Sequence, residues 1–157
     1  GIQRSGISFL AESSKKINEQ IMGMVYLDSL GYYTDQLEEP RVSLQLKEDY
    51  QNKGNYLALV GDLSSKKFIE SFYSKFSEEY EMPAKKIVLS RDSLAHSSED
   101  FVSLTGQGYP VLQLSDNSID RYPHYQKGTD TPDKIDYERL SGVAKSLYIA
   151  IESILSP

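Results

Sequence analysis

The stretch YPHYQKGTDTPDKIDYERL, residues 122–140, decides the fold of this chain. Its first half is rich in Pro, Gly, Thr and Asp, which favour turns. Its second half leads into a helix that we expect from Tyr137 to Leu155, because apolar residues recur there at three- and four-residue steps. Asp136 precedes this helix and is a favourable N-cap. A polar loop therefore runs directly into a long amphipathic helix.

Four short apolar runs upstream of this stretch indicate strands, because they are rich in Val, Leu, Ile and Tyr. They are Met24 to Leu27, Tyr56 to Val60, Ile87 to Leu89 and Tyr109 to Leu114. The polar segment 34–55 contains alternating Val42, Leu44 and Leu46, so we expect it to form a hairpin or an edge strand.

Helical patterns alternate with these strands. The clearest spans about residues 65–80, where Phe and Tyr residues recur on one face, and Ser64 is its expected N-cap. A weaker pattern covers about residues 8–22, and Gly23 after it is an expected C-terminal stop. A short helix is expected from Ser98 to Leu104.

Strands separated by helices of this length require crossover connections. We therefore predict one α/β domain over residues 1–157, with a mostly parallel central sheet and helices on both faces. In such sheets, ligands usually bind beyond the carboxyl ends of the strands. Three polar segments are expected at that edge: Asp28 to Gly31, Ser90 to Ser98, and Ser115 to Asp133.

Composition excludes several kinds of partner. The 17 Lys and Arg against 23 Asp and Glu give a net charge of −6, which would repel a nucleic-acid backbone. No apolar run approaches the roughly 18 residues of a membrane-spanning helix. The chain has no cysteine, so its localisation stays open between cytoplasmic and extracytoplasmic. Because it begins at Gly1 rather than Met, we expect that it was cut from a longer protein.

Residues 122–140 resemble the signature NPHYHTPxDTPDKLDYER of the zinc-dependent aminopeptidases, metallopeptidase family M twenty-eight, which includes bacterial leucyl aminopeptidases and glutaminyl cyclases. The run from Met24 to Tyr33, MVYLDSLGYY, resembles the strand of that family that ends in LDMIGY, and Asn52 to Gly61 resembles its next strand. The resemblance implies the second half of the family's phosphorylase/hydrolase-like fold. It also implies that Asp28 and Gln126 occupy positions of zinc ligands.

Departures from the family pattern change the expected function. Gln126 stands where the family has a zinc-binding His, and a carboxamide is a poor zinc ligand. Ala95 replaces the acid of a second family motif. The resemblance also places the family's paired glutamates before Gly1. We therefore expect a truncated domain that binds no zinc, has no catalytic residue and serves a structural or ligand-binding role.

Several alternatives stay open. The chain can be part of an active aminopeptidase whose other zinc ligands and general base lie upstream, or a relative of the single-zinc cyclases. His124 and Tyr125 are candidate substrate-binding residues, although His124 and His96 also suit plain hydrogen-bonding roles. The expected partners are a peptide or protein, a missing N-terminal half, or a second copy of the chain in a homo-oligomer.

Overall fold

A computed structural model describes residues 6–37, 53–90, 93, 99–116 and 122–156. Its main sheet has four strands in the order β1-β6-β4-β5, and a smaller sheet pairs β2 with β3. The main strands are β1 (Met24–Leu27), β4 (Leu57–Asp62), β5 (Ala84–Leu89) and β6 (Val111–Ser115). All four lie where the apolar runs predicted strands: β1 has the predicted bounds, and the ends of the other three differ by at most three residues.

The sheet is mostly parallel, as predicted, but it reverses at its centre. β1 pairs with β6 in parallel, and β4 pairs with β5 in parallel. β6 and β4 are antiparallel neighbours, with Leu59 opposite Leu114. β4 and β6 are buried along their whole length, as expected for strands covered on both faces.

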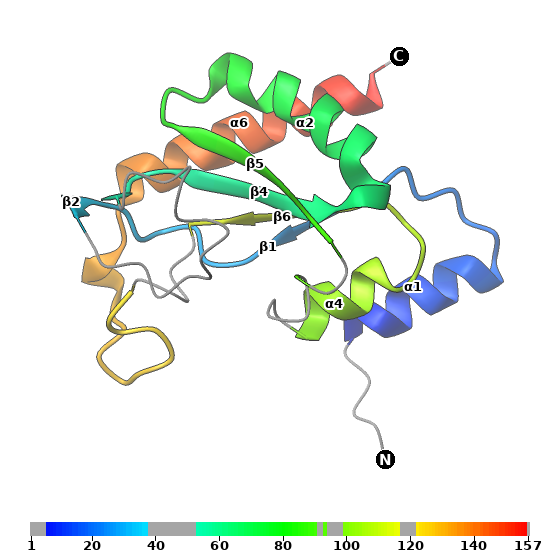
Figure 1. Ribbon diagram of the computed structural model, residues 1–157, viewed down its shortest axis with the longest axis horizontal. Coiled ribbons are helices and arrows are strands. Elements are labelled where there is room, and N and C mark those ends of the chain that lie inside the picture. The colour runs from blue at the N-terminus through cyan, green and yellow to red at the C-terminus, as the bar shows by residue number, and fades with distance from the viewer. Residues whose placement is uncertain (1–5, 38–52, 91–92, 94–98, 117–121, 157) are drawn as a thin grey trace.

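Helices cover both faces of the sheet, which confirms the α/β prediction (Figure 1). α2 (Lys66–Glu79) and α6 (Tyr137–Leu155) pack together on one face, where their aromatic and aliphatic side chains meet Leu57, Leu59 and Leu112. α1 (Gly6–Lys16) and α4 (Glu99–Thr105) lie on the other face, where Phe101 and Leu104 contact Val60 and Val111. The two apolar clusters flank the central strands. No helix in the described part of the chain is long and apolar enough to cross a membrane.

Two expected helix boundaries were wrong. The first helix ends at Lys16 rather than near residue 22, because Asn18 adopts a left-handed conformation with φ 53° and the chain turns there. Gly23 is therefore not a helix stop. It lies against α2 instead, where an added Cβ would stand 2.5 Å from the ring of Phe68.

The expected N-cap Ser64 is also corrected. A 3-10 turn, η2 (Leu63–Ser65), precedes α2, and the carboxylate of Asp62 accepts a hydrogen bond from the backbone N–H of Ser65 at 2.9 Å. The hydroxyl of Ser64 donates to the same carboxylate. By contrast, Asp136 caps α6 as predicted, by accepting from the N–H of Arg139.

The segment after β1 forms half of a short hairpin. β2 (Thr34–Leu37) pairs antiparallel with β3 (Lys53–Gly54), which supports the hairpin alternative. The expected alternation of Val42, Leu44 and Leu46 lies outside the described residues.

Candidate functional site

The candidate site lies where β1 and β6 end together. Because these strands are parallel, their carboxyl ends reach the same end of the sheet. The N–H of Asp28 donates to the carbonyl of Leu114 at 3.0 Å, and the N–H of Asp116 donates to the carbonyl of Ser29 at 2.8 Å. The polar residues that follow the two strands are thus held side by side.

Only two of the three polar segments expected at this edge meet there. Asp28 to Gly31 and Asp116 lie together, but Ser90 follows β5, whose carboxyl end is at the opposite end of the sheet because β4 and β6 are antiparallel. Ser90 and Ser93 contact each other through their hydroxyls at 3.0 Å. Ala95 and His96 lie outside the described residues.

Asp28 is the half-buried acid at the centre of the site. Its Oδ2 accepts a hydrogen bond from Nε2 of Gln113 at 2.9 Å, and its Oδ1 lies 3.5 Å from the hydroxyl of Ser29. Burial raises the pKa of the Asp28 carboxyl, although the hydrogen bonds from Ser29 and Gln113 oppose the shift. Ser29 has φ 57°, a left-handed conformation that a non-glycine residue adopts at some cost in energy.

Tyr125 lies within electrostatic range of Asp28. Burial raises the pKa of the Tyr125 hydroxyl, and the negative charge of Asp28 raises it further. Gln126 follows directly, is exposed, and has φ 54°. Among the four predicted site residues, Asp28 lies at the end of β1 and acts electrostatically on Tyr125, and Gln126 follows Tyr125 on the exposed loop.

His124 belongs to a neighbouring aromatic group rather than to the surroundings of Asp28. Its Nδ1 and the hydroxyl of Thr129 are 2.9 Å apart. The ring of Tyr122 lies 5.4 Å from the ring of His124 and 4.6 Å from the ring of Tyr32. The hydroxyl of Tyr122 donates to Asp130 at 2.8 Å, and desolvation together with this carboxylate raises the pKa of Tyr122 to about 12.

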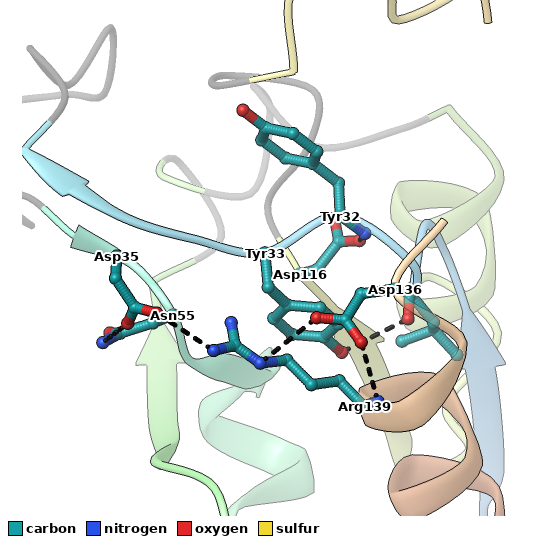
Figure 2. A network of polar contacts seen from close by, with 8 residues as sticks. Tyr32, Tyr33, Asp35, Asn55, Asp116, Asp136 and Arg139 are labelled. Carbon is teal, nitrogen blue, oxygen red and sulfur yellow. Dashed lines mark hydrogen bonds and ion pairs between the residues drawn. The ribbon is translucent and has the colours of Figure 1, made fainter. Parts of the chain in front are cut away.

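Beneath the site, a network of polar contacts fixes the chain after β1 (Figure 2). The buried carboxylate of Asp116 accepts from the N–H of Tyr32 at 2.7 Å. The N–H of Asp136 donates to the carbonyl of Gly31 at 2.8 Å. These bonds tie residues 31–32 to the end of β6 and to the start of α6.

Arg139 extends this network toward the hairpin. Its guanidinium contacts Asp136 and Asp35 and lies 5.4 Å from the ring centre of Tyr33. Asn55, beside β3, donates to Asp35 at 2.7 Å. All of these groups are engaged with one another, so we assign them a structural role.

The described residues around Asp28 do not by themselves make up a zinc site. The described part of the chain contains no group of three His, Cys, Asp or Glu side chains placed to hold a metal. One oxygen of Asp28 faces the amide N–H of Gln113, a hydrogen-bond donor that cannot bind a cation. Zinc prefers four ligands drawn from imidazole, thiolate and carboxylate groups, and Asp28 alone supplies one.

Sequence reasoning missed Gln113. It lies in the middle of β6, between Leu112 and Leu114, and is buried. A polar residue within an otherwise apolar strand was the available signal, because a buried amide requires a hydrogen-bond partner. Asp28 is that partner.

Known structures resemble this one in fold. The LapA aminopeptidase of Legionella pneumophila matches in two crystal structures, each with a TM-score of 0.66 and 14% sequence identity over 94% of this chain. The catalytic domain of CwlV, an N-acetylmuramoyl-L-alanine amidase from Bacillus (Paenibacillus) polymyxa, aligns over 96% of this chain and 66% of its own at a TM-score of 0.48 and 10% identity. No family model and no curated protein matches the sequence.

The fold is aminopeptidase-like. This agrees with the resemblance of residues 122–140 and of Asp28 to the aminopeptidase motifs, at the level of the fold. The chain spans only 35% and 36% of the two LapA chains. At 14% identity, the likeness does not carry the activity of LapA over to this chain.

Proposed function

We propose that this chain is an aminopeptidase-like domain that does not hydrolyse peptides by itself and acts as a structural or ligand-binding module. The observation that carries the proposal is the environment of Asp28. In place of further metal ligands, the described groups that hydrogen-bond this carboxylate are the amide of Gln113 and the hydroxyl of Ser29, and the phenol of Tyr125 lies within its electrostatic range.

The expected ligand is the amino end of a peptide or protein. Burial raises the pKa of Asp28, which means that the ionised carboxylate is only partly compensated by its neighbours. A ligand ammonium placed beside Asp28 would relieve that cost. Tyr125 would provide an adjacent aromatic surface for the ligand's first side chain.

Peptide binding can be measured by calorimetry or by NMR titration of the whole chain with short peptides that have an apolar first residue. We expect weak binding that requires a free amino group, so an N-acetylated peptide should bind at least roughly tenfold more weakly. Asp28→Asn should reduce binding by a similar factor, whereas Glu70→Gln, an exposed charge change on α2, should not. Equal binding of free and acetylated peptides, or undiminished binding to the Asp28→Asn variant, would contradict the ligand assignment.

Metal content tests the non-catalytic part of the proposal. After dialysis against zinc and then against metal-free buffer, we expect well under one zinc ion per wild-type chain. Gln126→His adds an imidazole at the position that the family resemblance assigns to a ligand, so zinc uptake should rise. Unchanged uptake would mean that residue 126 is not at a metal position. Stoichiometric zinc together with amide-bond cleavage by the wild-type chain would overturn the proposal.

A second candidate is that the domain forms part of an active aminopeptidase. It is favoured by the fold likeness to LapA and by the place of Asp28 at a strand end, where the family resemblance puts a zinc ligand. Release of the first residue from peptides, with zinc-dependent activity that Asp28→Ala abolishes, would establish this candidate instead.

A further inference from the structure

The outer face of α6 carries apolar side chains at the spacing of a coiled coil. Tyr137, Tyr148, Ile151 and Leu155 are 60%, 64%, 39% and 66% exposed. With the exposed Ser141 and Ala144, they form a row whose members are separated alternately by four and three residues. This row, which we call the outer stripe, consists of residues 137, 141, 144, 148, 151 and 155. Such spacing keeps one line of side chains facing a partner helix.

The outer stripe is separate from the face that anchors α6 to the domain. Val143, Ser146 and Ala150 are buried beneath the helix, and Leu147 and Ile154 pack against the same core. A helix that already buries one apolar face gains nothing within its own domain from a second one. Contiguous exposed apolar surface of this kind marks an interaction site.

We propose that two copies of this chain associate through the outer stripe, with their α6 helices antiparallel. In a parallel pair, the charged residues that flank the stripe of one copy would contact Leu147 and Ile154 of the other copy. These two side chains already pack into their own core. An antiparallel pair instead brings the charged flanks of the two helices together and is closed by a two-fold axis, the commonest symmetry of homodimers.

Charge selects the register. The flank of the outer stripe carries Glu138, Lys145 and Glu152, all exposed. Full overlap of the two helices would place Lys145 opposite Lys145 of the second copy, and Glu138 opposite Glu152. When one helix is shifted along the other by seven residues, Tyr148 of each copy meets Ile151 of the other, and Ala144 meets Leu155. Lys145 of each copy then lies opposite Glu152 of the other. This register leaves the N-terminal part of the stripe, Tyr137 and the polar Ser141, out of the contact, which is made by residues 144, 148, 151 and 155.

The interface is small, so association should be weak and reversible. Sedimentation velocity of the whole chain over about a hundredfold range of concentration should show a monomer–dimer equilibrium. Tyr148→Glu and Leu155→Glu should each weaken dimerisation at least roughly tenfold. Both side chains are exposed, so the thermal unfolding of these variants should stay close to that of the wild type.

Charge exchange provides the sharpest test. Lys145→Glu and Glu152→Lys should each weaken self-association roughly tenfold at low salt, because each creates two like-charged contacts. An equimolar mixture of the two variants should associate again, since every contact between them is then of opposite sign. The double variant Lys145→Glu/Glu152→Lys should also recover. Lys66→Glu, a matched change on α2, should have no effect.

Orientation can be checked separately, because the chain has no cysteine of its own. In the proposed register, the two copies of Ser141→Cys lie about 26 Å apart along the helix axis, so they should not cross-link. A mixture of Tyr148→Cys and Ile151→Cys should form disulfide-linked dimers. A monomer at all concentrations, failure of the mixed charge variants to associate, or efficient Ser141→Cys cross-linking would overturn the proposal. Loss of the dimer on Phe9→Glu would assign the contact to α1 instead.

Discussion

Arg139 and Asp35 form an ion pair between parts of the chain that are 104 residues apart. Nη2 of Arg139 lies 3.1 Å from Oδ2 of Asp35, and its Nε lies 3.3 Å from Asp136 (Figure 2). One guanidinium thereby joins β2 to the first turn of α6. The Arg139 side chain is largely buried, which reduces its screening by solvent.

Removal of this guanidinium should destabilise the fold. We expect Arg139→Ala to lower the free energy of unfolding by about 1–2 kcal/mol, because a charged hydrogen bond to Asp35 and an ion pair with Asp136 are lost. Arg139→Lys should lose part of this amount, since an ammonium lacks the planar fork that reaches both acids. Urea denaturation measures the change. Lys66→Ala, which breaks an exposed pair with Glu70, should cost under about 0.5 kcal/mol, and an equal cost for both alanine variants would contradict the bridging role.

Substitutions in the turn after β4 should also lower the free energy of unfolding. Asp62 accepts from the N–H of Ser65 at 2.9 Å and from its hydroxyl at 2.6 Å, and that hydroxyl accepts from the N–H of Val111 at 2.9 Å. We expect Asp62→Ala to cost about 2–3 kcal/mol and Ser65→Ala about 1–2 kcal/mol, since buried donors lose their acceptors. Ser64→Ala is the control, with an expected cost below about 0.5 kcal/mol because Ser64 is exposed. If urea denaturation shows the same loss of unfolding free energy for Ser65→Ala and Ser64→Ala, the predicted order of the variants is wrong.

Two glycines should respond to alanine in opposite directions. At Gly61 in β4, an added Cβ would lie 2.8 Å from the carbonyl oxygen of Val111 and would overlap Ile69, so Gly61→Ala should cost about 2–3 kcal/mol. At Gly142 within α6, a Cβ would meet no atom within 4 Å, so Gly142→Ala should raise stability by about 0.5–1 kcal/mol. Thermal unfolding of both variants distinguishes these outcomes. A stable Gly61→Ala variant would contradict the close packing of β4 on α2 and β6.

The stability of the chain should depend on pH through Asp28. Because burial raises the pKa of this acid, its ionised form is less favourable in the folded chain than in the unfolded chain. The resulting destabilisation is absent below the usual carboxyl pKa and complete above the raised value. The Asp28→Asn variant should therefore unfold at a higher temperature than the wild type near about pH 7, and the difference should vanish near about pH 3. A difference that is independent of pH would rule out ionisation as its cause.

Local patterns predicted the helices and strands well. The stripe of α2 and the cap at Asp136 are set by residues close in sequence, so their prediction needs no knowledge of the fold. The helix that was expected to end at Gly23 ends earlier because Asn18 also tolerates a left-handed backbone. Ser64 does not cap α2 because the 3-10 turn η2 intervenes: Asp62 caps that turn, and the N-cap of α2 is Ser65, which makes no side-chain capping bond.

The direction of β6 could not be predicted in the same way. It depends on which strands lie on either side of it, and those contacts join residues more than 50 positions apart, such as Val60 and Gln113. The hydrogen bond between Gln113 and Asp28 could not be predicted for the same reason, because the two residues are 85 positions apart in the sequence. The prediction that Gln126 and Asp28 mark an altered metal position stays a prediction, because it rests on resemblance.

The position of β6 also constrains when the domain can complete its sheet during synthesis. β1 is joined to the other described strands of the main sheet only through β6, which is the last of them to be made. Until the ribosome has released residues 111–115, β1 has no strand to pair with, so the apolar side chains of β1 stay without their sheet partner. Chaperone contacts should therefore concentrate on nascent chains shorter than this point.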